Sequence, residues 1–239
     1  MHVIELDTVT STMDVAAELI AAGTCLPWTT VIARRQTGGQ GRHDREWESA
    51  DGQSLLMTVI APISIRSEKV GLIALATGVA VAAAIEEFGL HVALKWPNDL
   101  YVHGRKLGGV LVKTHLDAPI TARIGVGINL LSVTPQMSDT AICLADVMSA
   151  PPQPRELAEC AVSKLRNAIE QLERDDSDAV LTAWMKRAMW LGEMVTVTTE
   201  LAVSGILKGV DATGRAILET GEGDIHLAVG DVLRGPRPA

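Results

Sequence analysis

The chain has 239 residues, 47% of them hydrophobic, and a formal net charge of -8. This length and composition are typical of a globular protein with a substantial core, and the acidic balance provides no global basic field for nucleic acid, which argues against DNA binding. Three cysteines lie far apart without metal-ligand spacing, and the N-terminus lacks a signal-peptide pattern, so we expect free thiols and a cytoplasmic protein.

The first half of the chain alternates strand and helix signals, as in a mixed α/β domain. The segment 70–85 is uncharged and mostly apolar. It is shorter than the roughly 20 residues that span a bilayer, so we expect a buried helix and no membrane association. The predicted elements are a strand at 3–6, a helix capped by Ser11 or Thr12 and running to about Ala22, strands at 30–34 and 54–60, the helix at 70–85, a strand at 92–96, a hairpin of 101–102 and 107–113 that turns at 103–104, and a strand at 122–130.

The second half is first helical and then β-rich. Pro154 suits the first turn of a helix, and short β-rich runs alternate with turns beyond Gly192. The predicted elements are helices at 154–174 and 177–189 and strands at 194–199, 202–210, 216–219 and 225–229. We therefore expect an α+β fold, with a mixed β-sheet and flanking helices in residues 1–190 and a small β-barrel in residues 191–239.

The long loop after residue 36 is the first candidate for a ligand site. Long loops in compact domains are often functional, and this one is too long for a simple hairpin. Its glycines let backbone amides approach phosphate, while Arg42 and Arg45 can donate charge-assisted hydrogen bonds to a carboxylate or phosphate. Trp47 is expected to close over a ligand and Trp96 to pack in the core. The alternative is a solvated loop whose charges only keep it soluble.

Two generic nucleotide motifs are absent. GGVLVKT at 108–114 ends like a P-loop but has Val112 where that motif requires glycine. Gly125 and Gly127 begin a GxG, but Leu130 takes the third glycine position and the segment lies within a predicted strand. Neither a Walker A motif nor a Rossmann fingerprint is predicted.

Five segments in order resemble the biotin protein ligases. They are STM at 11–13, QTGGQGRHDREW at 36–47, KWPND at 95–99, RKLGG at 105–109 and GVGIN at 125–129. KWPND followed by RKLGG downstream of the glycine loop is the specific part. The resemblance implies a biotin/lipoate ligase-like catalytic domain in 1–190 and an SH3-like domain in 191–239. About ten residues precede the first segment, too few for a helix-turn-helix domain, so we expect a short form without DNA-binding function.

The resemblance implies a two-step reaction. Biotin's carboxylate attacks the α-phosphorus of ATP to give biotinyl-5′-AMP, and a lysine of a biotin carboxyl carrier protein or domain then takes the biotinyl group. Arg42, Lys106 and Asp99 are the implied catalytic residues, the two cations because they would neutralise converging anions. Magnesium is expected on the phosphates, with no metal ligands predicted from the protein. A homodimer is left open.

The resemblance also implies which residues bind each substrate. Ser11, Thr12 and Gln36 would hydrogen-bond the ureido ring of biotin. Biotin contacts are implied for Ser11, Thr12, Met13, Gln36, Gln40, Gly41, Arg42 and Lys106, and nucleotide contacts for Gly39, Arg42, Arg45, Trp47, Asn98 and Asn129.

The role of Asp99 has two interpretations. Asp99 is the only carboxylate within KWPND and RKLGG, and we expect it to orient the incoming lysine or a magnesium ion. The alternative is that Asn98 and Asp99 only cap a turn after Pro97.

Two departures from the family pattern keep other functions open. Gln40 stands where the family commonly has arginine, and Met13 where it commonly has asparagine. One alternative is a lipoate-type ligase or acyltransferase of the same fold, since residues 34–39 faintly resemble that group. The other is a biotin-binding sensor without catalysis, which the retention of Arg42, Lys106 and Asp99 disfavours.

Overall fold

The computed structural model describes residues 1–115, 120–199 and 201–235. Its centre is a seven-stranded sheet with the strand order β1-β2-β3-β7-β6-β5-β4. β1 and β2 pair in parallel, and the other neighbours are antiparallel. The strands are β1 (His2–Val9), β2 (Thr29–Gln36), β3 (Ser54–Pro62), β4 (Ala93–Lys95), β5 (Asp99–Val102), β6 (Arg105–His115) and β7 (Thr121–Asn129).

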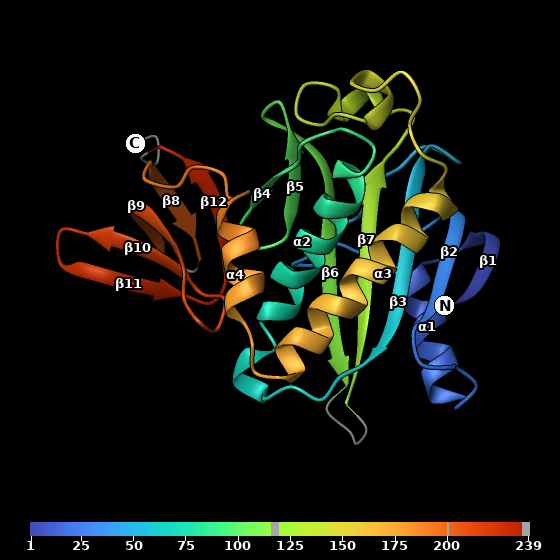
Figure 1. Cartoon of the computed structure of the whole chain (residues 1–239). Helices are drawn as coiled ribbons and strands as arrows, with labels where there is room; N and C mark the ends of the chain where they lie inside the picture. The colour runs from blue at the N-terminus through green and yellow to red at the C-terminus, as the bar shows by residue number, and fades with distance from the viewer. Residues whose placement is uncertain (116–119, 200, 236–239) are drawn as a thin grey trace.

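Helices pack on this sheet (Figure 1). α2 (Leu72–Glu86) and α3 (Pro154–Glu173) cover one face together, and α1 (Thr12–Ala21) packs against β2, β3 and β7. The apolar composition of α2 suits its position, because this helix is buried nearly all round. The remaining helical segments are α4 (Asp178–Met185) and three short 3-10 turns, η1 (Ser67–Lys69), η2 (Pro135–Met137) and η3 (Leu144–Asp146).

β7 shows how the sequence separates the two faces of the sheet. Side chains alternate along a strand, so Ile124, Val126 and Ile128 lie together in the core under the helices. Gly125 and Gly127 lie on the other face, toward α1 and the long loop. β7 therefore presents no side chain of its own at these two positions, and other side chains can pack closely against its backbone.

Most predicted elements are present, with shifts at their ends. The β5–β6 hairpin turns at His103 and Gly104, which both have positive φ, as a two-residue turn between twisted strands requires. The helix expected at 177–189 ends at Met185, because the chain then leaves the helix and hydrogen-bonds to Leu94 of β4. Within the described ranges, no helix has both the length and the apolar character that crossing a bilayer requires.

The C-terminal part forms a separate five-stranded antiparallel sheet with the order β11-β10-β9-β8-β12. No pairing closes it into a barrel within the described residues. β12 was not predicted, because it is a short run that follows a glycine. The strands are β8 (Met194–Thr198), β9 (Ala202–Val210), β10 (Ala216–Thr220), β11 (Gly223–Leu227) and β12 (Asp231–Arg234). The last residues of the domain predicted at 191–239 lie outside the described ranges.

Candidate active site

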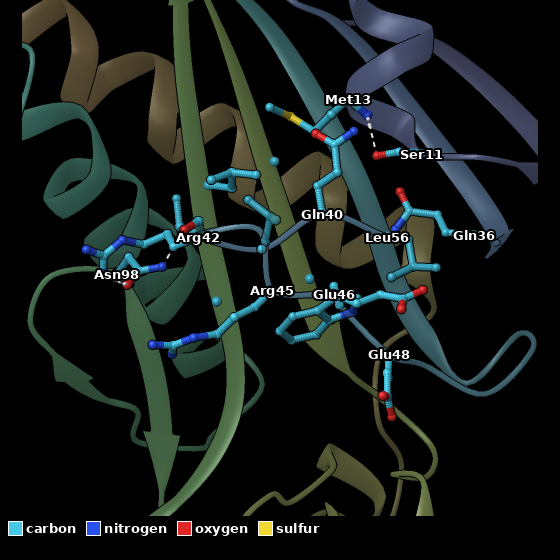
Figure 2. A pocket seen from close by; sticks show the side chains of 18 of the residues that line it. Ser11, Met13, Gln36, Gln40, Arg42, Arg45, Glu46, Glu48, Leu56 and Asn98 are labelled. Atoms are coloured by element: carbon cyan, nitrogen blue, oxygen red, sulfur yellow. Dashed lines mark hydrogen bonds between the residues drawn. The ribbon is translucent and has the colours of Figure 1, made fainter. Parts of the chain in front are cut away.

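A cavity of about 250 Å³ lies on the glycine face of the large sheet. It is bounded by the N-terminus of α1, the loop between β2 and β3, and the strands β6 and β7 (Figure 2). Asp231, at the start of β12, also lines it. Four of the five sequence segments that resemble biotin ligases contribute side chains that line it: STM, the glycine loop, KWPND and RKLGG. The fifth, GVGIN, contributes Gly125, Val126 and Gly127.

The α1 end of the cavity holds a network of hydroxyl and amide groups. Ser11 caps the helix, with its Oγ accepting a hydrogen bond from the amide of Met13. The amide and Oγ1 of Thr12 donate to Oε1 of Gln36 at 2.7 and 2.9 Å, and Thr58 donates to Thr12 at 2.8 Å. The Gln36 oxygen is thus occupied. Its amino group has no acceptor among the described residues and can donate to a ligand.

The floor of the cavity is glycine backbone covered by two large side chains. A Cβ at Gly125 would lie 3.1 Å from Sδ of Met13, and one at Gly127 would lie 2.5 Å from the Trp47 ring. Trp47 also lies 3.6 Å from the position of a Cβ at Gly109. Its indole nitrogen is buried without a hydrogen-bond partner among the described residues. Trp47 therefore occupies the floor beside the cationic groups.

The loop arginines lie at the opposite end, against the C-terminal sheet. Arg42 donates to Oδ1 of Asn98 and Oδ1 of Asp231, both at 3.2 Å, and to the carbonyl of Gly230 at 3.3 Å. Arg45 donates to the other oxygen of Asp231 at 2.5 Å. One carboxylate thus binds both arginines and holds the loop.

The pKa of Asp231 is lowered by these contacts. Burial alone would raise it, but the hydrogen bond and charge of Arg45 and the charge of Arg42 outweigh that effect. Because the folded pKa lies below the ordinary value of 3.8, the stabilisation is complete above about pH 4 and is lost as the pH falls through the folded pKa.

Asp231→Asn is therefore expected to lower the free energy of unfolding near pH 7 by about 1 kcal/mol or less, since Arg45 is 67% exposed and solvent screens it. The difference from the wild type should shrink between pH 4 and pH 2. Urea unfolding of both proteins across this range measures it. Asp224→Asn, on the same sheet but in an exposed pair with Lys208, is the control. A difference that stayed constant into acid would contradict the assignment.

Lys106 and Asp99 form an ion pair beside Trp47. Nζ of Lys106 lies 2.7 Å from Oδ1 of Asp99, and the two side chains are 31% and 17% exposed. The ammonium also lies 5.9 Å from the centre of the Trp47 ring. Strand β6 pairs directly with β5, so the hairpin sets this geometry. Asp99 therefore pairs with Lys106 at the wall of the cavity.

Asn98 is held from both sides. Its Nδ2 donates to the carbonyl of Val110 at 2.7 Å while its Oδ1 accepts from Arg42. Lys95, at the start of the same segment, lies over the rings of Tyr101 and Trp190 instead of in the cavity. Burial lowers the pKa of Lys95, with Asp99 acting in the opposite direction.

Two of the predicted site residues do not line the cavity. Gly39 packs against Trp47 within the loop, where its carbonyl accepts from the Trp47 amide and a Cβ would lie 2.4 Å from the Trp47 carbonyl. Asn129, at the end of β7, is buried and donates to the carbonyl of Ile142. The predicted residues that do line it are Ser11, Thr12, Met13, Gln36, Gln40, Gly41, Arg42, Arg45, Trp47, Asn98, Asp99 and Lys106.

Several lining residues were not predicted. Gly125 and Gly127 had a usable signal, because alternate glycines within a strand clear one face of a sheet. Met137 comes from the segment 132–144, which pairs with Lys106 through Thr140 and Ile142. Asp231 had no local signal at all.

The cavity has an amphipathic character. Its α1 end is formed by Met13, Leu56 and glycine backbone with the amide of Gln36, and its other end by Arg42, Arg45 and Lys106. This arrangement suits an acid with an apolar body whose carboxylate meets a second anion. Low-dielectric surroundings strengthen the attraction of the cations for both.

Known proteins share this organisation. Residues 5–129 match the model of the Biotin/lipoate A/B protein ligase family, which covers 125 of the 239 residues and so more than half of the chain. The chain belongs to the biotin/lipoate A/B protein ligase family. Residues 190–235 further match the Biotin protein ligase C terminal domain, which selects the biotin branch of the family.

Relatives of this family align along nearly the whole chain. A biotin--[acetyl-CoA-carboxylase] ligase of Mycobacterium tuberculosis is 29% identical over 96% of the chain and 88% of its own length. The bifunctional ligase/repressor BirA of Bacillus subtilis is 31% identical over 98% of the chain and 74% of its own length. Biotin protein ligase from Aquifex aeolicus, solved in complex with biotin and ATP, superposes with a TM-score of 0.86 at 25% identity, covering 98% of this chain and 99% of that one. The predicted family and ligase activity are confirmed.

Proposed function

We propose that this ligase activates biotin with ATP to biotinyl-5′-AMP and transfers biotin to a lysine of a biotin carboxyl carrier protein or domain. The observation that carries the proposal is the composition of the cavity. The amide donor of Gln36 and an apolar floor lie at one end, and the cations Arg42, Arg45 and Lys106 lie at the other. The similar proteins support the proposal, because they are biotin ligases, and one of them was solved in complex with biotin and ATP.

In the first step an oxygen of the biotin carboxylate attacks the α-phosphorus and pyrophosphate leaves. Two anions must approach each other, so a fixed positive charge lowers the barrier. Lys106 and Arg42 line the same cavity, and each is already held by a carboxylate, so neither needs reorganisation. We assign Arg45, which is more exposed, together with Trp47 and Asn98 to binding the nucleotide.

We expect magnesium at this site as an ion carried by the phosphates. No group of three or more His, Cys, Asp or Glu side chains suited to a metal occurs in the described parts of the chain. Bound to ATP, magnesium would withdraw charge from the phosphates and the leaving pyrophosphate. Of the carboxylates that line the cavity, Asp99 is paired with Lys106, and Asp231 is paired with Arg42 and Arg45.

At the α1 end, Gln36 is the first contact proposed for biotin. Its free amino group is positioned to donate to the ureido carbonyl, while Thr12 holds the Gln36 oxygen and so fixes the amide orientation. Ser11 accepts from the Met13 amide, which leaves its own hydroxyl proton to donate. Met13, Gln40 and Gly41 close the apolar part of the pocket.

In the second step the lysine amine of the acceptor attacks the acyl carbon and AMP leaves. Asp99 is proposed to orient this amine, by exchanging its contact with Lys106 for one with the incoming lysine. Asp99→Ala is expected to slow transfer from preformed biotinyl-5′-AMP about a hundredfold, the usual size of such a contribution. Single-turnover transfer to a carrier domain measures it.

The control for Asp99 is Asp51→Ala, an exposed carboxylate paired with Arg34 outside the cavity. Its transfer rate should stay within twofold of the wild type. An unchanged transfer rate in Asp99→Ala would remove this role and leave Asp99 only as the partner of Lys106.

The test of the proposed function is pyrophosphate release from ATP and magnesium, with biotin or lipoate supplied as the acid. Release with biotin and none with lipoate is the expected result. Release with lipoate would move the chain to the lipoate branch, and no release with either acid would support a sensor. Transfer to a purified carrier domain, followed by mass spectrometry, then tests the second step.

The proposal also covers the cellular compartment, the domain boundaries and the oligomeric state. The free thiols of Cys25, Cys143 and Cys160 support a reducing compartment, and we place the reaction in the cytoplasm. We treat residues 1–190 as the catalytic domain and 191–239 as an SH3-like domain, although its described strands form an open sheet. A homodimer is proposed through the unpaired edge of β1, which sedimentation with and without biotin would test.

A further inference from the structure

Three side chains from three separate elements meet at the α1 end of the cavity. Nε2 of Gln40 in the loop donates to Oδ1 of Asp14 in the first turn of α1, at 2.7 Å. Nζ of Lys113 in β6 donates to Oε1 of Gln40, also at 2.7 Å. Figure 2 shows Gln40 extending from the loop toward Met13, the neighbour of Asp14. We call these three residues the polar strap.

The strap uses both ends of one amide. A glutamine side chain has an oxygen that accepts and an amino group that donates, and here the oxygen meets an ammonium while the amino group meets a carboxylate. No ion pair with another group occurs for Asp14 or Lys113 among the described residues. Their opposite charges therefore act through Gln40, and the bridge requires one donor and one acceptor.

The strap attaches the loop to α1 and β6 through side chains, beside the backbone hydrogen bond from the Gly38 amide to the Thr10 carbonyl. Gly39 and Gly41 flank Gln40 and have no side chains to pack, and the Gly41 amide bonds back to Arg45 within the loop. The far end of the loop is held by Asp231 on β12. Without Gln40 the glycine segment would have the conformational freedom that makes ordering a loop costly.

We propose that Asp14 and Lys113 are positioning residues which, through Gln40, hold the glycine loop over the acid-binding end of the cavity before a ligand arrives. Preorganisation lowers the ordering cost of binding. The strap contacts neither reacting group, so it acts on the affinity for the acid and not on the rate of the chemical step. The predicted effect on the affinity for the acid rests on the proposed function, whereas the predicted ordering of the loop in the free protein does not.

A charge-swap cycle tests the strap. Asp14→Lys gives Gln40 two ammonium partners for one oxygen, and Lys113→Asp gives it two carboxylates for one amino group. The double variant restores one of each, and the Gln40 amide need only flip to bridge them. We expect each single variant to weaken biotin binding about fivefold to tenfold and to speed protease cleavage between residues 38 and 45 of the free protein. The double variant should return both to within twofold of the wild type.

The maximal rate and KM together distinguish a positioning role of the strap from a general loss of folded structure. The maximal rate of pyrophosphate release should stay within twofold in the Asp14 and Lys113 variants, while KM for biotin rises in the two single variants. Glu18→Lys, which makes the same charge change at an exposed site of α1, is the control and should behave as the wild type. If a single variant unfolds, Gln40→Met, with similar length but neither polar group, should show the same faster protease cleavage of the free protein. That readout does not depend on any contact between Gln40 and biotin.

Two results would overturn the proposal: single variants that bind and resist protease like the wild type, or a double variant as defective as its two singles combined. If the wild type releases no pyrophosphate with biotin, the proposed function fails. Loop cleavage in the free proteins still decides whether the strap holds the loop.

Discussion

Replacing Lys106 by Met is expected to slow biotin-dependent pyrophosphate release about a thousandfold, since one preorganised electrostatic contact to the transition state contributes about a hundred- to a thousandfold. The substitution also leaves Asp99 without its cationic partner inside the cavity, which adds repulsion toward the phosphates. The rate at saturating ATP and biotin, measured with a coupled phosphate assay after pyrophosphatase treatment, reports the chemical step.

The double variant Asp99→Asn with Lys106→Met separates these two causes. If the unpaired carboxylate accounts for part of the defect, the double variant should be faster than Lys106→Met alone. Lys208→Met, a surface lysine on the C-terminal sheet, is the control for loss of one positive charge and should leave the rate within twofold. A Lys106→Met protein that kept more than a tenth of the wild-type rate would contradict a catalytic role for Lys106.

Arg42→Gln is expected to lower kcat/KM for ATP by about a hundredfold or more. Arg42 is only 20% exposed, and its guanidinium contacts Asn98, Gly230 and Asp231 at once, so it can bind an anion without first being ordered. Glutamine retains two N–H donors but not the charge, and its single amide cannot reproduce the several donors that the planar guanidinium presents. Initial rates over a range of ATP concentrations give both kcat and KM.

Arg45→Gln provides the matched comparison. Arg45 shares Asp231 with Arg42, but its side chain is 67% exposed, and among the described residues its guanidinium pairs with that carboxylate alone. Its substitution should mainly raise KM for ATP, by about tenfold or less, with kcat little changed. A larger loss of kcat in Arg45→Gln than in Arg42→Gln would reverse the two assignments.

At the α1 end, the motifs predicted which residues would lie together but not how they would hydrogen-bond. Ser11, Thr12 and Gln36 were expected in one binding site, and their side chains do meet there. Which of their donors and acceptors remain available to a ligand was not predictable, because this depends on Thr12 donating to the oxygen of Gln36. A linear pattern names residue types, whereas the direction of each hydrogen bond follows from neighbours that packing brings together.

The hairpin that carries Asp99 and Lys106 was the most predictable part of the site. Two residues with positive φ determine the turn, and the turn determines the register as far as Tyr101 and Lys106. The register then shifts between Leu100 and Tyr101, so that Asp99 lies opposite Gly109, and this irregularity was not predicted. The end of α4 was less predictable, because hydrogen bonds to Leu94, about 90 residues earlier in the chain, replaced the helical ones.

The sequence by itself determined which chemical groups are available: the cations and carboxylate of three ordered motifs, the alternation that clears one face of β7, and the family. These signals are local, because strand alternation and turn preference act over a few residues. Only the tertiary structure decided that Asp231 would hold both loop arginines, and that Asp14 and Lys113 would share Gln40. Those contacts join residues distant in the chain, and they form because packing of sheets and helices brings their backbones together, which no local pattern encodes.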